Sequence, residues 1–317
     1  MSCYEYWAKI AAVADALSVY DRNDIQKKSL DEIVPLLDSI EVIAHDATIE
    51  FESAQHILQN ERMNDALKII RGFYVAVGAR LEMQEAYAIL DAAEPWTQVE
   101  SFHYYERYPI LVGNEVQLAG FAAGDRVVFI GGGPLPLTPV LLSTCHGVDG
   151  ISVERVPHIA ALSEQVLDKL GLGSAIEVVC GDETALADLE YDGVMVAALA
   201  EPKKRIFRNV RRSVAPETKV LYRTYSGMRA ILYAPVVSED LAGFREVGRV
   251  LPTGKVNNTS VMIKKEREYP RRATITTASL QNLIRSSVFA TSNSMSTVGR
   301  AGRCKYSATC VKQQENY

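Results

Sequence analysis

The chain contains 317 residues, of which 48% are hydrophobic and 23% are charged, as in ordinary soluble globular proteins. This length allows two domains, or one domain with extensions. The sequence has no long uncharged apolar run and no basic start followed by an apolar stretch, so neither a membrane span nor a secretory signal is predicted. Its five cysteines are scattered and form no CxxC pair, which argues against a disulfide framework or a zinc site and makes the cytoplasm the simplest location.

The net charge of −5 is unevenly distributed along the chain. The segment from Lys264 to the end carries 10 Lys+Arg and 3 Asp+Glu, a surplus of +7 that leaves −12 for the rest. An acidic body argues against nucleic acid as a partner. Residues 266–317 are rich in Ser, Thr and Arg without a sustained period, and we expect them to form a poorly ordered basic tail.

Residues 1–120 predict an all-helical N-terminal domain without a convincing strand. Two capping boxes, Ser29–Glu32 and Thr97–Glu100, each predict the start of a helix, and Pro109 is placed to kink or interrupt the second one. Between them, residues 61–90 place apolar side chains at a spacing of 3–4, which is the longest helical pattern in the chain.

Two glycines, Gly72 and Gly78, lie inside that long predicted helix. Each costs roughly 1 kcal/mol relative to alanine in a helix interior. Close packing of a neighbouring helix is the explanation that we favour. The alternative is that Gly78, one turn before Glu82, leaves space for a ligand beside that carboxylate.

The pattern changes after residue 125 to alternating strands and helices. The predicted strands are 126–130, 150–153, 176–180, 192–197, 218–224, 246–251 and 259–264. The predicted helices between the first five strands are 137–144, 157–171, 183–189 and 201–212. This alternation predicts an α/β fold with a doubly wound, mostly parallel sheet, whose last two strands can form an antiparallel hairpin at the edge. Such a sheet is the layout of Rossmann-like class I S-adenosylmethionine-dependent enzymes.

A glycine turn lies at the start of this α/β region. Val127–Ile130 predicts a buried strand, and Gly131, Gly132 and Gly133 predict a turn without Cβ atoms, which is followed from Pro134 by the start of a helix. Together these elements form a nucleotide cradle, because the backbone approaches a ligand closely and the N–H groups at the helix end face it. An ordinary structural turn would also produce this pattern.

Two acidic residues follow the glycine turn. Glu154 ends the second predicted strand, 21 residues beyond Gly133, where an acid usually accepts hydrogen bonds from both ribose hydroxyls of a nucleotide. Asp182 ends the third strand, where an acid suits the adenine amino group of S-adenosylmethionine, although it would serve equally as a helix N-cap. A nicotinamide cofactor would satisfy the ribose site as well. Pro136, at the third glycine position of the dinucleotide fingerprint, and Asp182 favour S-adenosylmethionine.

Aromatic and basic side chains offer further candidates. The faces of Tyr104, Tyr105 and Tyr108 could hold a sulfonium cation, although tyrosines at this spacing more often belong to a core or an interface. Arg223, at the end of the fifth predicted strand, or Arg229 could bind a substrate carboxylate bidentately. The predicted helix 201–212 is expected to present a solvated basic face made of Lys203, Lys204, Arg205, Arg208, Arg211 and Arg212.

Five stretches of the sequence resemble one known family. They are FIGGGPLPLT (129–138), AHDATIEFESAQHIL (44–58), VAALAEPKKRIFRNV (196–210), YRTYSGMRAILYAPV (222–236) and LPTGKVNNTSV (251–261). They strongly resemble the nicotianamine synthase family, in particular its archaeal and microbial branch. The resemblance runs from about Met1 to Ile263 and does not include the basic tail.

The resemblance implies a fold and a reaction. It implies a helical lid domain, 1–120, over a Rossmann-like S-adenosylmethionine domain, 121–265, which leaves 266–317 as the tail. The implied reaction transfers the 3-amino-3-carboxypropyl group of S-adenosylmethionine onto an amine nitrogen and releases 5′-methylthioadenosine. It builds a metal-chelating product of the nicotianamine type, and the enzyme itself is expected to need no metal.

The resemblance also implies roles for particular residues. Glu82 would accept the proton of the attacking amine, and the hydroxyl of Tyr108 would help to orient that amine. The expected donor site comprises Gly131, Gly132, Gly133, Pro134, Glu154 and Asp182. The expected acceptor site comprises Tyr105, Arg223, Tyr225 and Asn258.

Two other functions remain open at this point: a small-molecule methyltransferase that uses S-adenosylmethionine, and a nucleotide-binding protein without activity. Small molecules are the expected partners, and a homodimer is conceivable.

Overall fold

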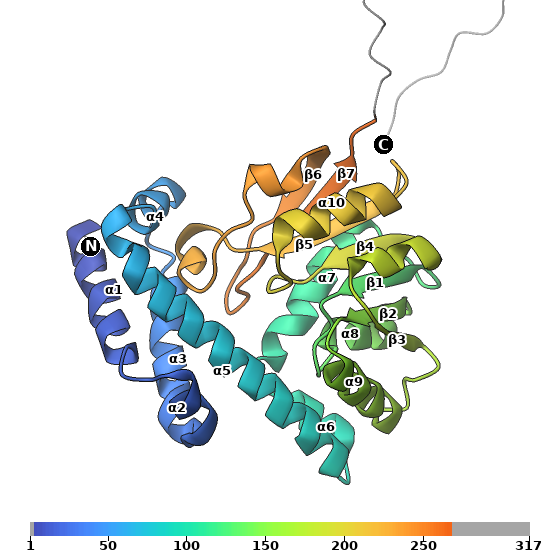
Figure 1. Ribbon diagram of the computed structural model, residues 1–317, viewed down its shortest axis with the longest axis horizontal. Coiled ribbons are helices and arrows are strands. Elements are labelled where there is room, and N and C mark those ends of the chain that lie inside the picture. The colour runs from blue at the N-terminus through green and yellow to red at the C-terminus, as the bar shows by residue number, and fades with distance from the viewer. Residues whose placement is uncertain (1–2, 268–317) are drawn as a thin grey trace, which may run out of the picture. The chain divides into compact units, whose positions relative to one another are not determined.

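The computed structural model describes residues 3–267 (Figure 1). These residues belong to one compact unit, Met1–Arg267. The poorly ordered tail that we predicted for 266–317 lies, from Glu268 onward, outside the described residues.

The first part of the chain is helical, as predicted, and residues 3–125 contain no strand. The α-helices are α1 (Cys3–Leu17), α2 (Arg22–Lys27), α3 (Leu30–Ala44), α4 (Phe51–Leu58), α5 (Asn64–Asp91), α6 (Pro95–Ser101) and α7 (Tyr108–Ala119). Two short 3-10 helices lie among them, η1 (Glu61–Met63) and η2 (Tyr105–Arg107).

The structure confirms a helix start at the first predicted capping box, Ser29–Glu32, and contradicts the one at Thr97–Glu100. Ser29 caps α3 by accepting a hydrogen bond from the N–H of Asp31. The prediction at Thr97 is wrong, because α6 already begins at Pro95, whose missing N–H costs nothing in a first helical turn. Pro109 also lies in a first turn, that of α7, so α6 and α7 are separate helices and neither is kinked by it.

The second part of the chain forms a seven-stranded sheet in the order β3-β2-β1-β4-β5-β7-β6. The strands are β1 (Arg126–Ile130), β2 (Asp149–Glu154), β3 (Ile176–Cys180), β4 (Gly193–Val196), β5 (Lys219–Thr224), β6 (Phe244–Val250) and β7 (Thr259–Lys265). The helices are α8 (Leu137–His146), α9 (Pro157–Lys169), η3 (Glu183–Asp188), α10 (Lys203–Ser213), η4 (Gly227–Ile231) and η5 (Ser238–Leu241). β1 to β5 run parallel, and β7 is antiparallel to both β5 and β6, which confirms the predicted Rossmann-like fold.

Helix α5 connects the helical part to the sheet. In Figure 1 it runs between α1–α4 on one side and the α/β region on the other, and it packs against α1 and α9. Its buried face includes Ile70, Val77 and Ile89, which are inaccessible to solvent. The buried apolar residues of α1–α6 form one continuous cluster with residues of α8, α9 and η4, so the helical part shares its core with the α/β part. Within residues 3–267, no helix combines the length and the apolar character needed to cross a membrane.

Candidate active site

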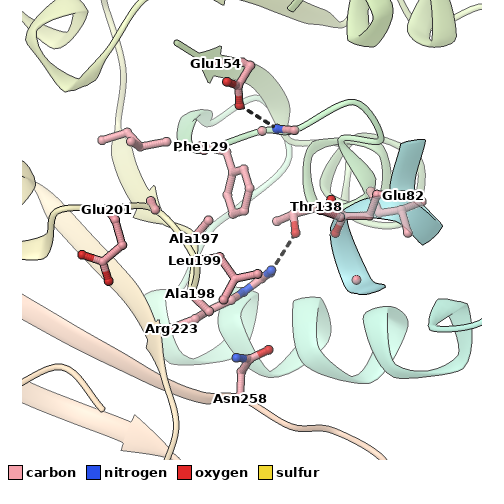
Figure 2. A pocket seen from close by; sticks show the side chains of 18 of the residues that line it. Glu82, Phe129, Thr138, Glu154, Ala197, Ala198, Leu199, Glu201, Arg223 and Asn258 are labelled. Atoms are coloured by element: carbon pink, nitrogen blue, oxygen red, sulfur yellow. Dashed lines mark hydrogen bonds between the residues drawn. The ribbon is translucent and has the colours of Figure 1, made fainter. Parts of the chain in front are cut away.

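A cavity of about 390 Å³ lies where the carboxyl ends of the central strands meet α5 and α7. Ligands bind at this edge of open α/β sheets, because the loops that follow the parallel strands diverge there. Figure 2 shows Glu154 and Asn258 on opposite sides of the pocket, while Glu82 projects from α5 at its flank. The walls therefore combine the glycine turn after β1 with side chains of the helical part.

The glycine turn requires glycine for two physical reasons. Gly131 has φ of 89° and Gly133 has φ of 66°, a region that L side chains rarely adopt. A Cβ at Gly131 would also lie 3.2 Å from the Cβ of Ala197, and a Cβ at Gly132 would lie 2.0 Å from Oγ of Ser152. All three glycines line the cavity, so close approach of a ligand to the backbone is possible there.

Pro134 is buried and does not line the cavity, and its expected role in donor binding stays a prediction. The cavity wall continues instead with Leu135, Leu137 and Thr138.

Glu154 is held in place by the glycine turn. Its carboxylate accepts hydrogen bonds from the N–H of Gly133 at 3.1 Å and from the N–H of Val156 at 2.9 Å. The side chain lines the cavity and is only 9% exposed. A carboxylate has about four acceptor positions, so capacity remains for two ribose hydroxyls.

Asp182 is a helix cap and a cavity residue at once. Its Oδ1 accepts hydrogen bonds from the N–H of Thr184 at 3.0 Å and from the hydroxyl of Thr184 at 2.6 Å. These bonds lower the pKa of Asp182, with a smaller contribution from Arg205, whose Nη2 lies 3.7 Å from Oδ2. Oδ2 is the oxygen that remains for a ligand amino group.

Glu82 is the least compensated acid of the cavity. It forms no hydrogen bond or ion pair with any residue in the described part of the chain, although it lines the cavity beside Gly133. Burial among the cavity walls raises the pKa of Glu82 to about 7, and the negative charge of Glu154 adds to the effect. A carboxyl with this pKa can both accept and return a proton near neutrality.

Tyr108 lies in the cavity as predicted, whereas Tyr105 does not. Burial raises the pKa of Tyr108, and the charge of Glu82 raises it further, so its hydroxyl stays protonated and can donate a hydrogen bond. The turn η2 carries Tyr105 away from the cavity into partly buried apolar contacts, and Tyr104 lines the wall instead. The acceptor role expected for Tyr105 stays a prediction, although this side chain does not line the cavity. The guanidinium of Arg107 covers the Tyr104 ring at 4.4 Å from its centroid.

Arg223 lines the cavity but is not a free carboxylate clamp. Its Nε and Nη2 each donate to the carboxylate of Glu115 at 2.7 Å. Nη2 also donates to the hydroxyl of Thr138 at 2.8 Å, the bond drawn in Figure 2. Both members of the ion pair are almost fully buried. The alternative clamp, Arg229, donates to the carbonyls of Val256 and Gly254 and does not line the cavity.

A second buried ion pair, between Arg107 and Glu41, lies beside the cavity, which Arg107 lines. Arg107 binds Glu41 through two hydrogen bonds, and Asn257 donates to Glu41 at 3.1 Å and to the hydroxyl of Tyr74 at 3.2 Å. Asn257 also lies 2.5 Å from Nε2 of His45. Glu41, Tyr74 and Asn257 were missed in the sequence, because they lie up to 216 residues apart and belong to no local motif.

Tyr225 and Asn258 also line the cavity, and their place in the acceptor site stays a prediction. The Nδ2 amide of Asn258 is buried beside the hydroxyl of Tyr225, and no hydrogen bond of regular geometry satisfies it among the described residues. An unsatisfied buried donor is costly, so a ligand acceptor atom at this position would relieve that cost.

Lys203 corrects the expectation of a solvated basic face on α10. It is 7% exposed, and its ammonium group donates to three backbone carbonyls, those of Ala197 at 3.2 Å, Ala198 at 2.8 Å and Ala200 at 2.5 Å. Burial lowers the pKa of Lys203 to about 8. The carbonyls belong to the loop after β4, which lines the cavity and packs on Gly131. The pattern of basic residues on α10 gave no sign of this role.

Comparisons with known proteins agree with this geometry. The family model described as nicotianamine synthase protein matches residues 40–269. Nicotianamine synthase 3 of Arabidopsis thaliana is 29% identical over 189 residues, covering 54% of this chain and 58% of that protein. L-histidine 2-aminobutanoyltransferase of Yersinia pestis is 23% identical over 198 residues, covering 62% of this chain and 74% of that protein. The chain thus spans little more than half the length of the plant relative.

Solved structures of MtNAS are more similar. A variant of MtNAS with a glutamate replaced by glutamine, in complex with S-adenosylmethionine, is 52% identical, with a TM-score of 0.79. The match covers 84% of this chain and 100% of that chain. MtNAS in complex with MTA and tNA is 51% identical, with a TM-score of 0.80 and the same coverage. The family model covers well over half of the sequence, and this chain therefore belongs to the nicotianamine synthase family.

Proposed function

We propose that this protein transfers the 3-amino-3-carboxypropyl group of S-adenosylmethionine onto an amine nitrogen and releases 5′-methylthioadenosine. The observation that carries the proposal is the unpaired carboxyl of Glu82, with a pKa of about 7, facing a glycine-lined nucleotide cradle. An aminocarboxypropyltransferase needs this combination, because its donor is already activated and its acceptor amine must lose a proton.

The reaction is a substitution at the γ-carbon of the aminocarboxypropyl arm. A bond forms between the amine nitrogen and this carbon, the bond from the carbon to sulfur breaks, and its electron pair stays on sulfur. Before the attack, the acceptor's ammonium group passes one proton to Glu82 and becomes a free amine. As the amine attacks, the positive charge moves from sulfur to the newly alkylated nitrogen. An α-ammonium has a pKa of about 8 or above, so proton transfer to a carboxylate with a pKa of about 7 is uphill by roughly one pKa unit or more.

The other residues of the cavity would hold the two substrates. Glu154 would accept the ribose hydroxyls, and Oδ2 of Asp182, which also faces Arg205, would accept the adenine amino group. Tyr108 would donate its hydroxyl hydrogen to the reacting groups beside Glu82. The helical segment 1–120 would serve as a lid over segment 121–265, because a closed site excludes water, which competes as a nucleophile.

The relatives support this assignment. The variant of MtNAS in which glutamine replaces a glutamate has been crystallised with S-adenosylmethionine, and MtNAS itself with MTA and tNA. We take MTA to be the methylthioadenosine that this reaction would release. The Yersinia pestis relative is named for transfer of a 2-aminobutanoyl group to histidine, which is a transfer of the same type. We therefore place the product among metal-chelating compounds of the nicotianamine type. The absence of a metal requirement, the cytoplasmic location and a homodimer remain predictions.

The proposal is tested by identifying the nucleoside released. The purified full chain is incubated with S-adenosylmethionine alone, with added L-glutamate, and with added L-histidine. We expect methylthioadenosine, together with an amino-acid product whose mass has grown by one or more aminocarboxypropyl units. S-adenosylhomocysteine as the main nucleoside would replace the proposal with a methyltransferase, and binding without either product would point to a nucleotide-binding protein without activity.

A further inference from the structure

Glycine at position 78 is unusual in its setting. Tyr74, Gly78 and Glu82 follow one another at four-residue spacing on one face of α5, and all three line the cavity. Gly78 lies in the middle of a 28-residue helix, where glycine is less favourable than alanine. A glycine in this place calls for a compensating reason.

Packing does not supply that reason. A Cβ built on Gly78 would meet no atom within 4 Å, apart from its two chain neighbours and the backbone of its own helix. The close approach of a neighbouring helix, which we favoured from the sequence, is therefore wrong. Because Gly78 lines the cavity, a side chain at this position would project into the space that a ligand would fill.

The position along α5 indicates which ligand would be affected. Glu82 is the member of this series nearest the nucleotide cradle. Its Oε2 lies 3.3 Å from the position that a Cβ on Gly133 would take. At the Tyr74 end, the hydroxyl contacts Asn257 at 3.2 Å. An α-helix rises about 6 Å over four residues. Gly78 therefore lies about 6 Å from Glu82 along the axis of α5, in the direction of Tyr74 and away from the cradle. The donor's nucleoside would not reach this wall, but an acceptor that approaches Glu82 from the opposite side would.

The same end of the cavity contains a polar group without a partner. The buried Nδ2 amide of Asn258 lies beside the hydroxyl of Tyr225 but forms no hydrogen bond of regular geometry in the described part of the chain, and Figure 2 shows this side chain across the pocket from Glu154. Both arginines nearby, Arg107 and Arg223, are already bound to glutamates. The amide could therefore bind the carboxylate of an amino-acid acceptor, which would extend along the open wall at Gly78.

Building on the proposed function, we propose that Gly78 is the size determinant of the acceptor site. The missing side chain admits an amino-acid acceptor that an earlier transfer has lengthened. The volume of residue 78 then limits the number of aminocarboxypropyl units in the product.

The test compares Gly78→Ala and Gly78→Leu with Gly72→Ala. Gly72 is a matched control, because it lies in the same helix, also has no atom within 4 Å of its Cβ position, is exposed and does not line the cavity. We expect both alanine variants to have a raised Tm, because alanine favours the helix. Gly72→Ala should keep the wild-type product. Gly78→Ala should lose at least tenfold in kcat/KM for the acceptor, while its Kd for S-adenosylmethionine changes less than twofold.

Product masses give a readout that a purely structural role would not change. Assays with S-adenosylmethionine alone, with L-glutamate and with L-histidine should show Gly78→Ala products shifted toward fewer units, and Gly78→Leu should accumulate the shortest product. An unchanged product distribution in both Gly78 variants would overturn the inference, and so would a loss of S-adenosylmethionine binding that accounts for the lost activity. Failure of the proposed function is distinguishable, because the wild-type chain itself would then release no methylthioadenosine.

Discussion

Two parts of the cavity are built in different ways. One is the cradle after β1, formed by Gly131–Gly133 and Glu154, and the other is the wall opposite it, which contains Glu82 and the pairs Glu115–Arg223 and Glu41–Asn257. The cradle consists of neighbouring strand ends, and Glu154 is held there by the backbone N–H of Gly133, only 21 residues earlier. The wall joins distant segments through buried side chains, such as Glu115 with Arg223 and Glu41 with Asn257. Glu82 belongs to the wall and, unlike those acids, has no partner among the described residues.

Because of this difference, we expect the cradle to bind the donor and the wall to carry out the chemistry. A backbone turn holds its geometry at little side-chain entropy cost, which suits recognition of an invariant nucleoside. The wall contains side chains whose charges are matched, apart from Glu82, and an unmatched acid in a low-dielectric site has a raised pKa. The cradle should therefore control donor affinity, and the wall should control proton transfer and the choice of acceptor.

Replacing the unmatched acid tests this separation most strongly. Glu82→Gln should lower kcat by about 10²–10⁴-fold, the usual contribution of a general base, because the amide cannot accept the proton. Its Kd for S-adenosylmethionine, measured by calorimetry, should stay within a few-fold of wild type. Glu85→Gln is the control, since Glu85 is bound by Gln98 and does not line the cavity. Normal turnover by Glu82→Gln would refute the base assignment.

Breaking a matched pair in the wall should affect stability. Glu115→Gln leaves the buried Arg223 charge without its carboxylate, so the free energy of unfolding should fall by about 3 kcal/mol. Arg223→Met alone should cost a similar amount. The double variant should cost clearly less than the sum of both, as measured by urea denaturation, because no unpaired charge then remains. Simple additivity would mean that the pair is not coupled as described.

The pH dependence should follow the pKa of Glu82, which is about 7. Below this pH the base is protonated, so kcat should fall roughly tenfold per pH unit between about pH 6 and 5. The raised pKa also means that the protonated carboxyl favours the folded state, and this stabilisation is lost as the pH rises through 7. Glu82→Gln should therefore lose less stability than wild type between pH 5 and 8. An identical loss in both proteins would place Glu82 in a solvated environment.

The smallest effect is expected for Lys203, which holds the loop that packs against the cradle. Lys203→Met removes the donors to the carbonyls of Ala197, Ala198 and Ala200, which shape the loop that packs on Gly131. Affinity for S-adenosylmethionine should fall roughly tenfold, since a hydrogen bond from a charged group is worth about 1.5–3 kcal/mol and the loop can partly relax. The KM for the acceptor should change less. Lys204→Met, on the exposed side of α10, should leave both constants unchanged.

Local patterns predicted the cradle well, but they predicted the wall poorly. The strand and glycine pattern located β1, the turn and Glu154 because all three depend on residues close in sequence. The spacing of tyrosines offered Tyr104, Tyr105 and Tyr108 together, but only Tyr104 and Tyr108 line the cavity, because the 3-10 turn η2 breaks the helical period there. Lys203 was grouped with a solvated face because burial of a charged residue depends on acceptors that a helix pattern does not contain.

The sequence by itself determined the order of the elements, the Rossmann-like sheet, the nucleotide cradle and the resemblance to one family, since hydrophobic period and glycine placement are local properties. Only the tertiary structure decided which charges meet. It paired Arg223 with Glu115, left Glu82 unpaired and opened space at Gly78, because each outcome depends on side chains from separate segments packed around one cavity. The physical reason is that a buried charge or an empty volume is a property of its surroundings, and the fold assembles those surroundings from distant parts of the chain.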